Sequence, residues 1–293
     1  MANFEFIENK LKSDYPNHFE DIIRGLQMPK KVTFRVNTTK TTVDEVLKLL
    51  YQVGLSVKEV EWNKEAFILN QGDEKVLRAL DIYEKGHIYL QNLSSMIPPI
   101  ILNPGKGDIL DMAAAPGGKT TQMVAMNPLA NITACEQNPI RAEKLKYNLV
   151  KQGATKVTVL IKDARMLDDY FRFDQILLDA PCSGIGTLDL NHESNYKHFT
   201  EQLIKKSIET QKALMLKAIQ LLKSKQTMVY STCSLLKSEN EAIIEFALNT
   251  KKVEVIPINL DIEGKLPSTI PGVLTVMPND LYEGFFICLL RKK

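Results

Sequence analysis

Short apolar runs that alternate with helical segments are the feature that most constrains this fold. From about residue 105 onward each run has the length and composition of a buried strand. These runs are residues 108–110, 131–135, 157–161, 175–178 and 227–230. Helical segments begin at about residue 119 and cover about 139–150 and 201–222. Because strands that alternate with helices form parallel sheets covered on both sides, we expect an α/β fold with a doubly wound, mostly parallel Rossmann-like sheet.

The first 85 residues show a different pattern. Helices are expected near 4–11, 19–26 and 42–50, and strands near 32–37, 57–62 and 66–69. The third helix opens with Thr42, Asp44 and Glu45, which is the pattern of a capped helix start. We therefore expect a small α+β accessory domain over residues 1–85 and a catalytic domain over residues 86–293. No Gly/Ser-rich linker separates them, and the chain is expected to end in a strand at 284–290.

Overall charge and hydropathy exclude some classes of protein. The net charge of the 293-residue chain is only +2, so a nucleic-acid surface would have to be local, with Lys30, Lys31, Arg35 and Lys40 as candidates. No apolar run approaches the roughly 18 residues of a membrane helix. The N-terminus lacks a basic segment followed by an apolar one, so we expect a cytoplasmic protein.

The four cysteines do not form a metal or disulfide framework. They are Cys135, Cys182, Cys233 and Cys288, with no C-x-x-C pair, and the four histidines are scattered. A zinc site and a disulfide scaffold are therefore not expected. Cys135 and Cys288 lie within apolar runs, which favours small buried side chains without chemistry.

The other two cysteines share a different setting. Cys182 and Cys233 each follow a predicted buried strand, and Asp179 stands three residues before the first of them. In an open α/β sheet, residues just beyond the carboxyl ends of strands face the ligand crevice. Two thiols and an acid at one crevice indicate covalent chemistry rather than packing.

A turn rich in small residues lies between the first strand of this region and the next helix. It reads Asp-Met-Ala-Ala-Ala-Pro-Gly-Gly-Lys-Thr over 111–120. A P-loop is excluded because Ala113 stands where that motif needs glycine, and the G-x-G-x-x-G spacing is absent. Glu136 ends the next strand, where it can accept hydrogen bonds from ribose, and Asp163 follows the third strand, where it can receive an adenine amino group. Taken singly, either acid would be read as a surface group or a helix cap.

These segments together resemble the NOL1/NOP2/Sun (RsmB/NOP) family of S-adenosylmethionine-dependent RNA cytosine-5 methyltransferases. The matching segments cover most of the chain in the order found in the family. They are residues 35–38, 91–95, 113–120, 179–184, 232–234, 239–241 and 283–286.

The resemblance implies a cofactor site and a set of catalytic residues. The residues implied in binding S-adenosylmethionine are Ala113, Ala114, Ala115, Pro116, Gly117, Gly118, Lys119, Glu136, Arg141, Asp163 and Asp179. By the same likeness Cys233 is the nucleophile that adds to C6 of cytosine, and Cys182 resolves the adduct. Asp179 would bind the N3/N4 edge of the base, and Lys119 would also reach it. Covalent addition is chemically sensible because C5 of cytosine is a poor nucleophile until a thiolate has added to C6.

The resemblance also implies the partners. RNA is expected to bind, with the N-terminal module, including Arg35 and Lys40, as the part that holds it. Ribosomal RNA is favoured and tRNA is possible, and a single-stranded or loop cytosine costs least to extrude. We expect a monomer with no membrane and no metal.

The chain departs from the family pattern in three places. Residues 187–194 replace an Arg-rich loop, Glu283 replaces the usual Asp, and no C-terminal RNA-binding module is expected beyond Lys293. The altered loop leaves the identity of the RNA open.

Two other functions fit parts of the sequence. A non-catalytic RNA-binding or assembly factor could retain the fold, although the complete set of Asp179, Cys182 and Cys233 argues against it. A methyltransferase for proteins or small molecules would not need two thiols in one crevice.

Overall fold

The computed structural model describes residues 2–293, and their contacts divide the chain into two compact units. The first unit contains the residues up to 30, residues 168–172 and residues 178–293. The second contains residues 31–167 and 173–177. The predicted domain boundary at residue 85 stays a prediction, because compact units of contact are not a test of independent folding.

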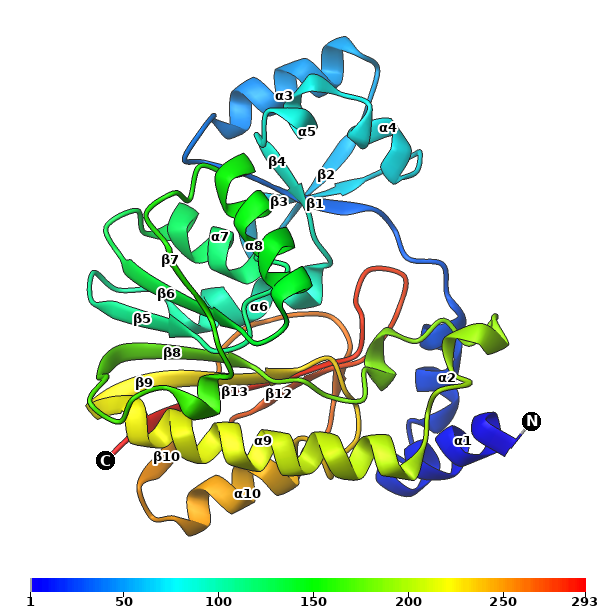
Figure 1. The fold of residues 1–293 in the computed structure, drawn as a ribbon. Coiled ribbons are helices and arrows are strands. Elements are labelled where there is room, and N and C mark those ends of the chain that lie inside the picture. Colours follow the sequence, from blue (N-terminus) through cyan, green and yellow to red (C-terminus); the bar gives the residue numbers. More distant parts are fainter. Residues whose placement is uncertain (1) are drawn as a thin grey trace. The chain divides into compact units, whose positions relative to one another are not determined.

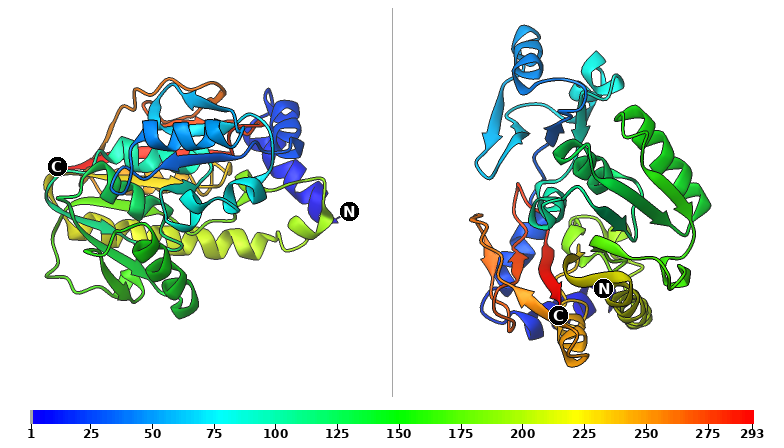
Figure 2. Two further views of the ribbon diagram at one scale, coloured as in Figure 1. Left: turned by 90° about the horizontal axis from the view of Figure 1, so that it is seen from above. Right: turned by 90° about the vertical axis from the view of Figure 1, so that its left-hand side faces the viewer.

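The second unit begins with a small antiparallel sheet. Its strand order is β2 (Val57–Val60), β3 (Asn63–Leu69), β1 (Thr33–Val36) and β4 (Ile88–Leu90). Helix α3 (Val43–Gln52) packs on it through a core that contains Phe34, Val46 and Phe67 (Figure 2). The short helices α4 (Glu74–Arg78) and α5 (Asp81–Glu84) precede β4. The expectation that Trp62 belongs to a strand is wrong, because the chain turns at that residue to pair β2 with β3.

The same unit continues into a parallel sheet. The strands are β5 (Asp108–Asp111), β6 (Asn131–Glu136), β7 (Thr158–Ile161) and β8 (Phe173–Asp179), the last of which runs to the edge of the unit. Strand β5 pairs in parallel with β6 and β8, and β6 pairs in parallel with β7. Helices α6 (Leu93–Leu102), α7 (Gly118–Met126) and α8 (Pro139–Lys151) accompany these strands. The predicted α/β class with a small N-terminal α+β module is confirmed.

The strands of the first unit pair mainly with β13, and each of these pairings is antiparallel. Strand β13 (Phe285–Lys292) pairs with β9 (Leu222–Thr232), with β12 (Leu274–Val276) and with β10 (Val253–Ile256). A short β11 (Lys265–Leu266) pairs with β12. Helices α9 (Glu201–Leu221) and α10 (Glu241–Asn249) lie side by side along this group of strands (Figure 1). The predicted terminal strand is confirmed.

The N-terminal helices support the loops that follow the strands in this unit. Helices α1 (Ala2–Asp14) and α2 (Phe19–Gln27) share one apolar core with the loop residues Ile185, Leu235 and Leu236. Each of these three side chains is almost completely buried. Burial of such a side chain contributes about 1.5–3 kcal/mol, so the core fixes the positions of the two loops that carry Cys182 and Cys233. None of the helices described between residues 2 and 293 is long and apolar enough to cross a membrane.

Candidate active site

Two neighbouring strand ends in the first unit bring Cys182 and Cys233 together. Just beyond β8, the backbone N–H of Ala180 donates to the carbonyl of Ser231 on β9 at 2.8 Å. Each strand then continues into its cysteine loop, and the two sulfur atoms lie 3.4 Å apart. Both cysteines are free thiols with partly exposed side chains. The arrangement places two reactive groups within contact of each other at one edge of the sheet.

Asp179 is the last residue of β8 and lies beside the same strand end. Its Oδ1 accepts a hydrogen bond from the Ser231 hydroxyl at 2.7 Å. Its side chain is half-buried rather than sealed. The carboxylate is therefore held in place and still open to a ligand.

Backbone hydrogen bonds between three closely packed segments hold the Cys233 loop in place. The N–H of Gly186 donates to the carbonyl of Cys233 at 3.0 Å, and the N–H of Gly284 donates to the carbonyl of Gly186 at 2.8 Å. A Cβ atom at Gly186 would lie 2.0 Å from the Gly284 carbonyl oxygen. Only glycine fits at this position, so the loop after Cys182 is fitted directly to the backbone of Cys233.

The electrostatic environment distinguishes the two thiols. The pKa of Cys182 is raised well above its usual range by its hydrogen bond to the Cys233 sulfur, by burial, and by the charges of Cys233 and Glu239. A raised pKa keeps the proton on Cys182. The pair therefore favours a state in which Cys182 is the neutral thiol.

Glu239 is a site residue whose role the sequence did not indicate. It is fully buried, and its carboxylate accepts hydrogen bonds from Ser183 and Ser234, the residues that follow the two cysteines. The only available signal was its place in the segment 239–241, which matches the family. Nothing in the spacing showed that it would reach a serine 56 residues away.

The predicted cofactor loop lies in the second unit between β5 and α7. The N–H of Ala114 donates to the carbonyl of Cys135 at 2.8 Å, which ties the loop to the neighbouring strand β6. Gly117 is the N-cap of α7 with φ of 104°, in the left-handed region that favours glycine. A Cβ atom at Gly117 would lie 2.9 Å from Leu145, and one at Gly118 would lie 3.1 Å from the Tyr89 ring. The two glycines therefore let the loop pack closely against Leu145 and Tyr89, where a larger residue would force it to move.

Glu136 and Arg141 are connected through this loop. Glu136 ends β6 with 4% of its surface exposed, and its Oε1 accepts from the N–H of Asn138 at 2.8 Å. The guanidinium of Arg141 lies 3.7 Å from the Glu136 carboxylate and donates to the carbonyl of Ala115 at 2.7 Å. Arg141 thus fixes the loop next to an acid that is suited to hydroxyl donors.

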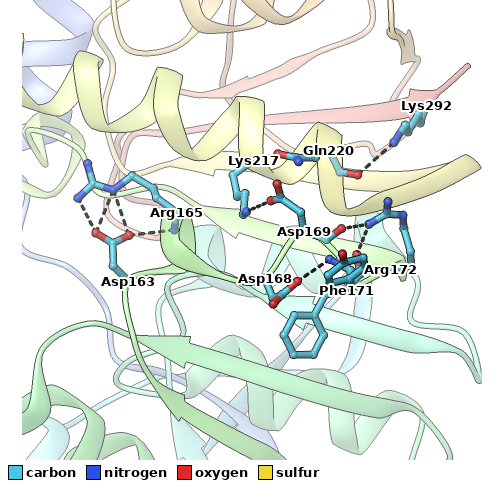
Figure 3. Close-up of polar contacts among 10 residues, drawn as sticks. Asp163, Arg165, Asp168, Asp169, Phe171, Arg172, Lys217, Gln220 and Lys292 are labelled. Atoms are coloured by element: carbon cyan, nitrogen blue, oxygen red, sulfur yellow. Dashed lines mark hydrogen bonds and ion pairs between the residues drawn. The ribbon is translucent and has the colours of Figure 1, made fainter.

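Asp163 has a stronger partner than expected. It caps a short 3₁₀ helix, Ala164–Met166, and its carboxylate forms an ion pair with Arg165 at 2.5 Å (Figure 3). Hydrogen bonds from Arg165 lower the pKa of Asp163. The acid is ionised, but any adenine amino group would share it with Arg165.

The segment 168–172, within the first unit, is fixed on α9. Lys217 donates to the carboxylate of Asp169 at 2.5 Å, and Arg172 donates to the carbonyl of Phe171 at 2.7 Å (Figure 3). These contacts are structural and do not involve a predicted site residue.

Lys119 lies in the first turn of α7. Its Nζ donates to the hydroxyl of Ser95 at 2.8 Å, and its side chain is half-buried. Ser95 belongs to the segment 91–95 that matches the family. The structure therefore links two of the matching segments and leaves the role of Lys119 toward a base as a prediction.

The expectation that Arg35 contacts RNA is wrong. Arg35 is only 2% exposed, and its guanidinium donates to Gln91 at 2.9 Å, to the carbonyl of Gly118 at 3.0 Å and to Thr121 at 2.6 Å. It also lies over the Tyr89 ring, 5.0 Å from the centroid. Because its guanidinium is buried and is hydrogen-bonded to groups inside the protein, Arg35 holds the start of α7 instead of facing a partner.

Known proteins resemble the chain over its whole length. A family described as 16S rRNA methyltransferase RsmB/F matches residues 99–291, and a ferredoxin-like domain of RsmF/B-like methyltransferases matches residues 5–74. Ribosomal RNA small subunit methyltransferase F of Shewanella sp. (strain ANA-3) is 33% identical over 305 aligned residues, which cover 100% of this chain and 63% of the relative. The chain therefore spans less than two thirds of the length of that relative.

Solved structures share the fold. A methyltransferase homolog protein from Pyrococcus horikoshii is 32% identical with a TM-score of 0.84, over 97% of this chain and 94% of the other. The structure of NSun6 from Pyrococcus horikoshii with SFG is 24% identical with a TM-score of 0.87, over 98% of this chain and 97% of the other. Among residues 2–293, no group of three or more His, Cys, Asp or Glu side chains is arranged to hold a metal ion.

Proposed function

The chain belongs to the RsmB/F family of methyltransferases, and on that premise we propose that it transfers a methyl group from S-adenosylmethionine to C5 of a cytosine in RNA. The observation that carries the proposal is the contact between the Cys182 and Cys233 sulfur atoms at 3.4 Å. A methyltransferase that acts on an oxygen, on a nitrogen or on a more reactive carbon needs no thiol nucleophile. Methylation of C5 of cytosine needs one, because the ring must be activated by addition at C6.

S-adenosylmethionine is the cofactor of this family, and the residues of the second unit fit it. Residues 113–119 form a loop whose two glycines pack closely within the protein, next to the N-terminal end of α7, where backbone N–H groups point out of the helix. Glu136 is buried at the end of β6, where its carboxylate is suited to ribose hydroxyls. Arg141 would brace the loop, and Asp163 would accept from adenine. When bound, the cofactor supplies an electrophilic methyl group on a sulfonium.

Cys233 begins the reaction in this proposal. Its thiolate lone pair forms the S–C6 bond, and the electrons of the C5–C6 double bond move toward N3. Asp179 binds the N3/N4 edge and offsets the charge that develops there. C5 then carries the electron density needed to bond the methyl carbon.

Cys182 completes the cycle in the same proposal. After methylation the C5 proton leaves to a base, the C5–C6 double bond forms again, and the S–C6 bond breaks to return the thiolate of Cys233. Cys182, in contact with that sulfur and held as a neutral thiol, is placed to stabilise the departing thiolate by donating an S–H hydrogen bond to it. Lys119 is proposed to steady the base.

Methyl transfer to RNA tests this function. Isotope-labelled S-adenosylmethionine is incubated with ribosomal RNA, with tRNA and without RNA, using the wild type, Cys233→Ala, Cys182→Ala and the matched control Cys288→Ala. We expect label in RNA for the wild type and the control, and none for Cys233→Ala. Full activity of Cys233→Ala would contradict the covalent mechanism, and label without RNA would favour a protein or small-molecule substrate.

The RNA itself is also a proposal. Ribosomal RNA is favoured because the curated relative is a ribosomal RNA methyltransferase by name, and tRNA is the alternative. Bisulfite sequencing of RNA from cells without the protein would identify the cytosine. A cytoplasmic location and a monomeric state stay predictions. The non-catalytic assembly factor would be favoured if calorimetry detected no binding of S-adenosylmethionine.

A further inference from the structure

The carboxylate of Glu239 binds the residues that directly follow Cys182 and Cys233. Glu239 accepts from the N–H of Ser183 at 2.8 Å and from the Ser183 hydroxyl at 2.5 Å. It also accepts from the Ser234 hydroxyl at 2.5 Å. Ser183 directly follows Cys182, and Ser234 directly follows Cys233. The two serine hydroxyls lie 3.3 Å apart, so they run beside the two sulfur atoms as a second pair.

Glu239 is itself held firmly. The Tyr230 hydroxyl donates to its backbone carbonyl at 2.6 Å, and the amide of Gln211 lies 3.4 Å from its Oε1. Gln211 also donates to the carbonyl of Pro181 at 3.0 Å, just before Cys182. A fully buried carboxylate is stable only when hydrogen bonds replace its lost water. These donors come mainly from the cysteine loops, so the loops and the carboxylate depend on each other.

A neighbouring amide binds the Cys233 loop from both sides. The side chain of Asn240 accepts from Thr232 at 2.5 Å and donates to the carbonyl of Ser234 at 2.8 Å. The residues before and after Cys233 are therefore fixed by one amide, while Glu239 connects this loop with that of Cys182. Glu239 bonds side-chain groups of both loops.

We propose that Glu239 is the positioning residue of the thiol pair: its carboxylate holds the two cysteine loops in register and places a negative charge beside Cys182 while Cys233 reacts. The effect of Glu239 on catalysis rests on the proposed function. The position of the two loops and the effect of the Glu239 charge on Cys182 can be measured whether or not the protein methylates RNA.

The charges around Cys182 favour the same state as the geometry, in which Cys182 keeps its proton. The groups that face Cys182 are Cys233, Glu239, Tyr230 and, through Tyr230, Asp179. Burial raises the pKa of Tyr230 as well, and neighbouring charges that include Glu239 and Asp179 raise it further, so its hydroxyl stays neutral. The pKa of Cys182 is raised by its hydrogen bond to Cys233, by burial, by the charge of Cys233 and then by the charge of Glu239. Removal of the Glu239 charge should therefore lower the pKa of Cys182.

Thiol titration tests the charge. In the Cys233→Ala background Cys182 has no partner thiol, and its rate of alkylation by iodoacetamide is followed against pH by peptide mass spectrometry. Glu239→Gln preserves size and removes the charge, and the serine hydroxyls, which can also accept, can turn toward the amide N–H groups that replace one acceptor oxygen. The matched control is Glu241→Gln, an equally buried neighbour that accepts from Ser268 at 2.8 Å. We expect the pH midpoint of Cys182 to move down in Glu239→Gln and to stay unchanged in Glu241→Gln.

Loss of the serine hydroxyls tests the geometry. The double variant Ser183→Ala/Ser234→Ala preserves the charge of Glu239 and removes two of its hydrogen bonds. A displacement of about 1 Å at a reacting group costs about 10²-fold in rate, so kcat should fall by about that factor with KM for RNA nearly unchanged. Glu239→Asp has the charge of the wild type but a side chain that is too short to reach both serines. It should therefore have a Cys182 pH midpoint near that of the wild type and a lower kcat. Circular dichroism and thermal melting confirm that each variant is folded.

The results separate this role from the proposed function. An unchanged Cys182 midpoint in folded Glu239→Gln, or wild-type kcat in the double serine variant, would overturn the positioning role. A shifted midpoint in a protein that methylates no RNA would uphold the arrangement of charge and refute only the proposed function.

Discussion

Substitution of Gly117 by alanine tests the close packing of the cofactor loop. Gly117 has φ of +104°, and its added Cβ atom would lie 2.9 Å from Leu145 Cδ1. The left-handed backbone costs an L-residue about 1–2 kcal/mol, and overpacking costs about 1–3 kcal/mol more. Gly117→Ala should therefore lower the free energy of unfolding by about 2–5 kcal/mol, unless the loop moves to relieve the strain.

A matched glycine separates the two contributions. Gly54 has φ of +76°, and nothing lies within 4 Å of its would-be Cβ atom. Gly54→Ala should therefore cost only the backbone part, about 1–2 kcal/mol. Urea unfolding of both variants gives the difference, which measures the clash with Leu145.

The same pair of variants tests the location of the cofactor. If the loop relieves strain by moving, affinity falls instead of stability, by tenfold for each 1.4 kcal/mol. Calorimetric titration with S-adenosylhomocysteine should show weaker binding to Gly117→Ala and wild-type binding to Gly54→Ala. The reasoning is refuted if Gly117→Ala is as stable as Gly54→Ala and binds the ligand as tightly as the wild type.

Three further substitutions or measurements examine separate parts of the structure. Arg35→Met removes charged hydrogen bonds worth about 1.5–3 kcal/mol each, including that to Gly118, so calorimetry should show at least about tenfold weaker binding of S-adenosylhomocysteine, and unaltered affinity would contradict the structural role of Arg35. Burial raises the pKa of Glu241 above its ordinary value of 4.5, so its protonated form stabilises the fold below that pH, and this stabilisation is lost as the pH rises above it. Glu241→Gln should therefore reduce the decrease in the free energy of unfolding, measured in urea, between pH 4.5 and 7. An unchanged dependence of that free energy on pH would refute the assignment. Burial raises the pKa of Cys135 to about 12 and that of Cys288 above its usual range, so neither should be alkylated in the native protein at pH 8, and rapid labelling of either would show that its strand is open.

Local signals in the sequence located most of the elements that carry the site. The cap predicted at Thr42 is present as a full capping box with Glu45, because this signal depends on residues three apart. The strand that precedes Cys182 is present in β8, and the strand that precedes Cys233 is present in β9. In both cases a short run of buried apolar residues was enough to predict the strand.

Elements without a clear period were missed. Helix α6 contains Pro98 and Pro99, which argue against a helix by propensity, yet both are buried and neighbouring Met96 and Ile97 are fully buried. Tertiary packing outweighs the local cost there. Strands β10, β11 and β12 are short and antiparallel, so they offer too few residues for an alternation to be seen.

Long-range contacts explain the remaining errors about the site. Arg35 was expected to contact RNA as part of a local basic group in the N-terminal module, but Gln91 and Thr121 supply its partners from 56 and 86 residues away. Glu239 was noticed only as part of a matching segment, since its bonds to the cysteine loops exist only in the folded chain. Such roles depend on which loops meet, and local patterns do not contain that information.

The central claim is a bond between the Cys233 sulfur and C6 of a cytosine. Cys182→Ala, which should slow release, is incubated with S-adenosylmethionine and substrate RNA, denatured, digested with nuclease, and analysed by peptide mass spectrometry. We predict a methylated cytidine nucleotide covalently attached to the peptide that contains Cys233. The account is contradicted if no adduct forms on that peptide while Cys233→Ala still methylates the RNA.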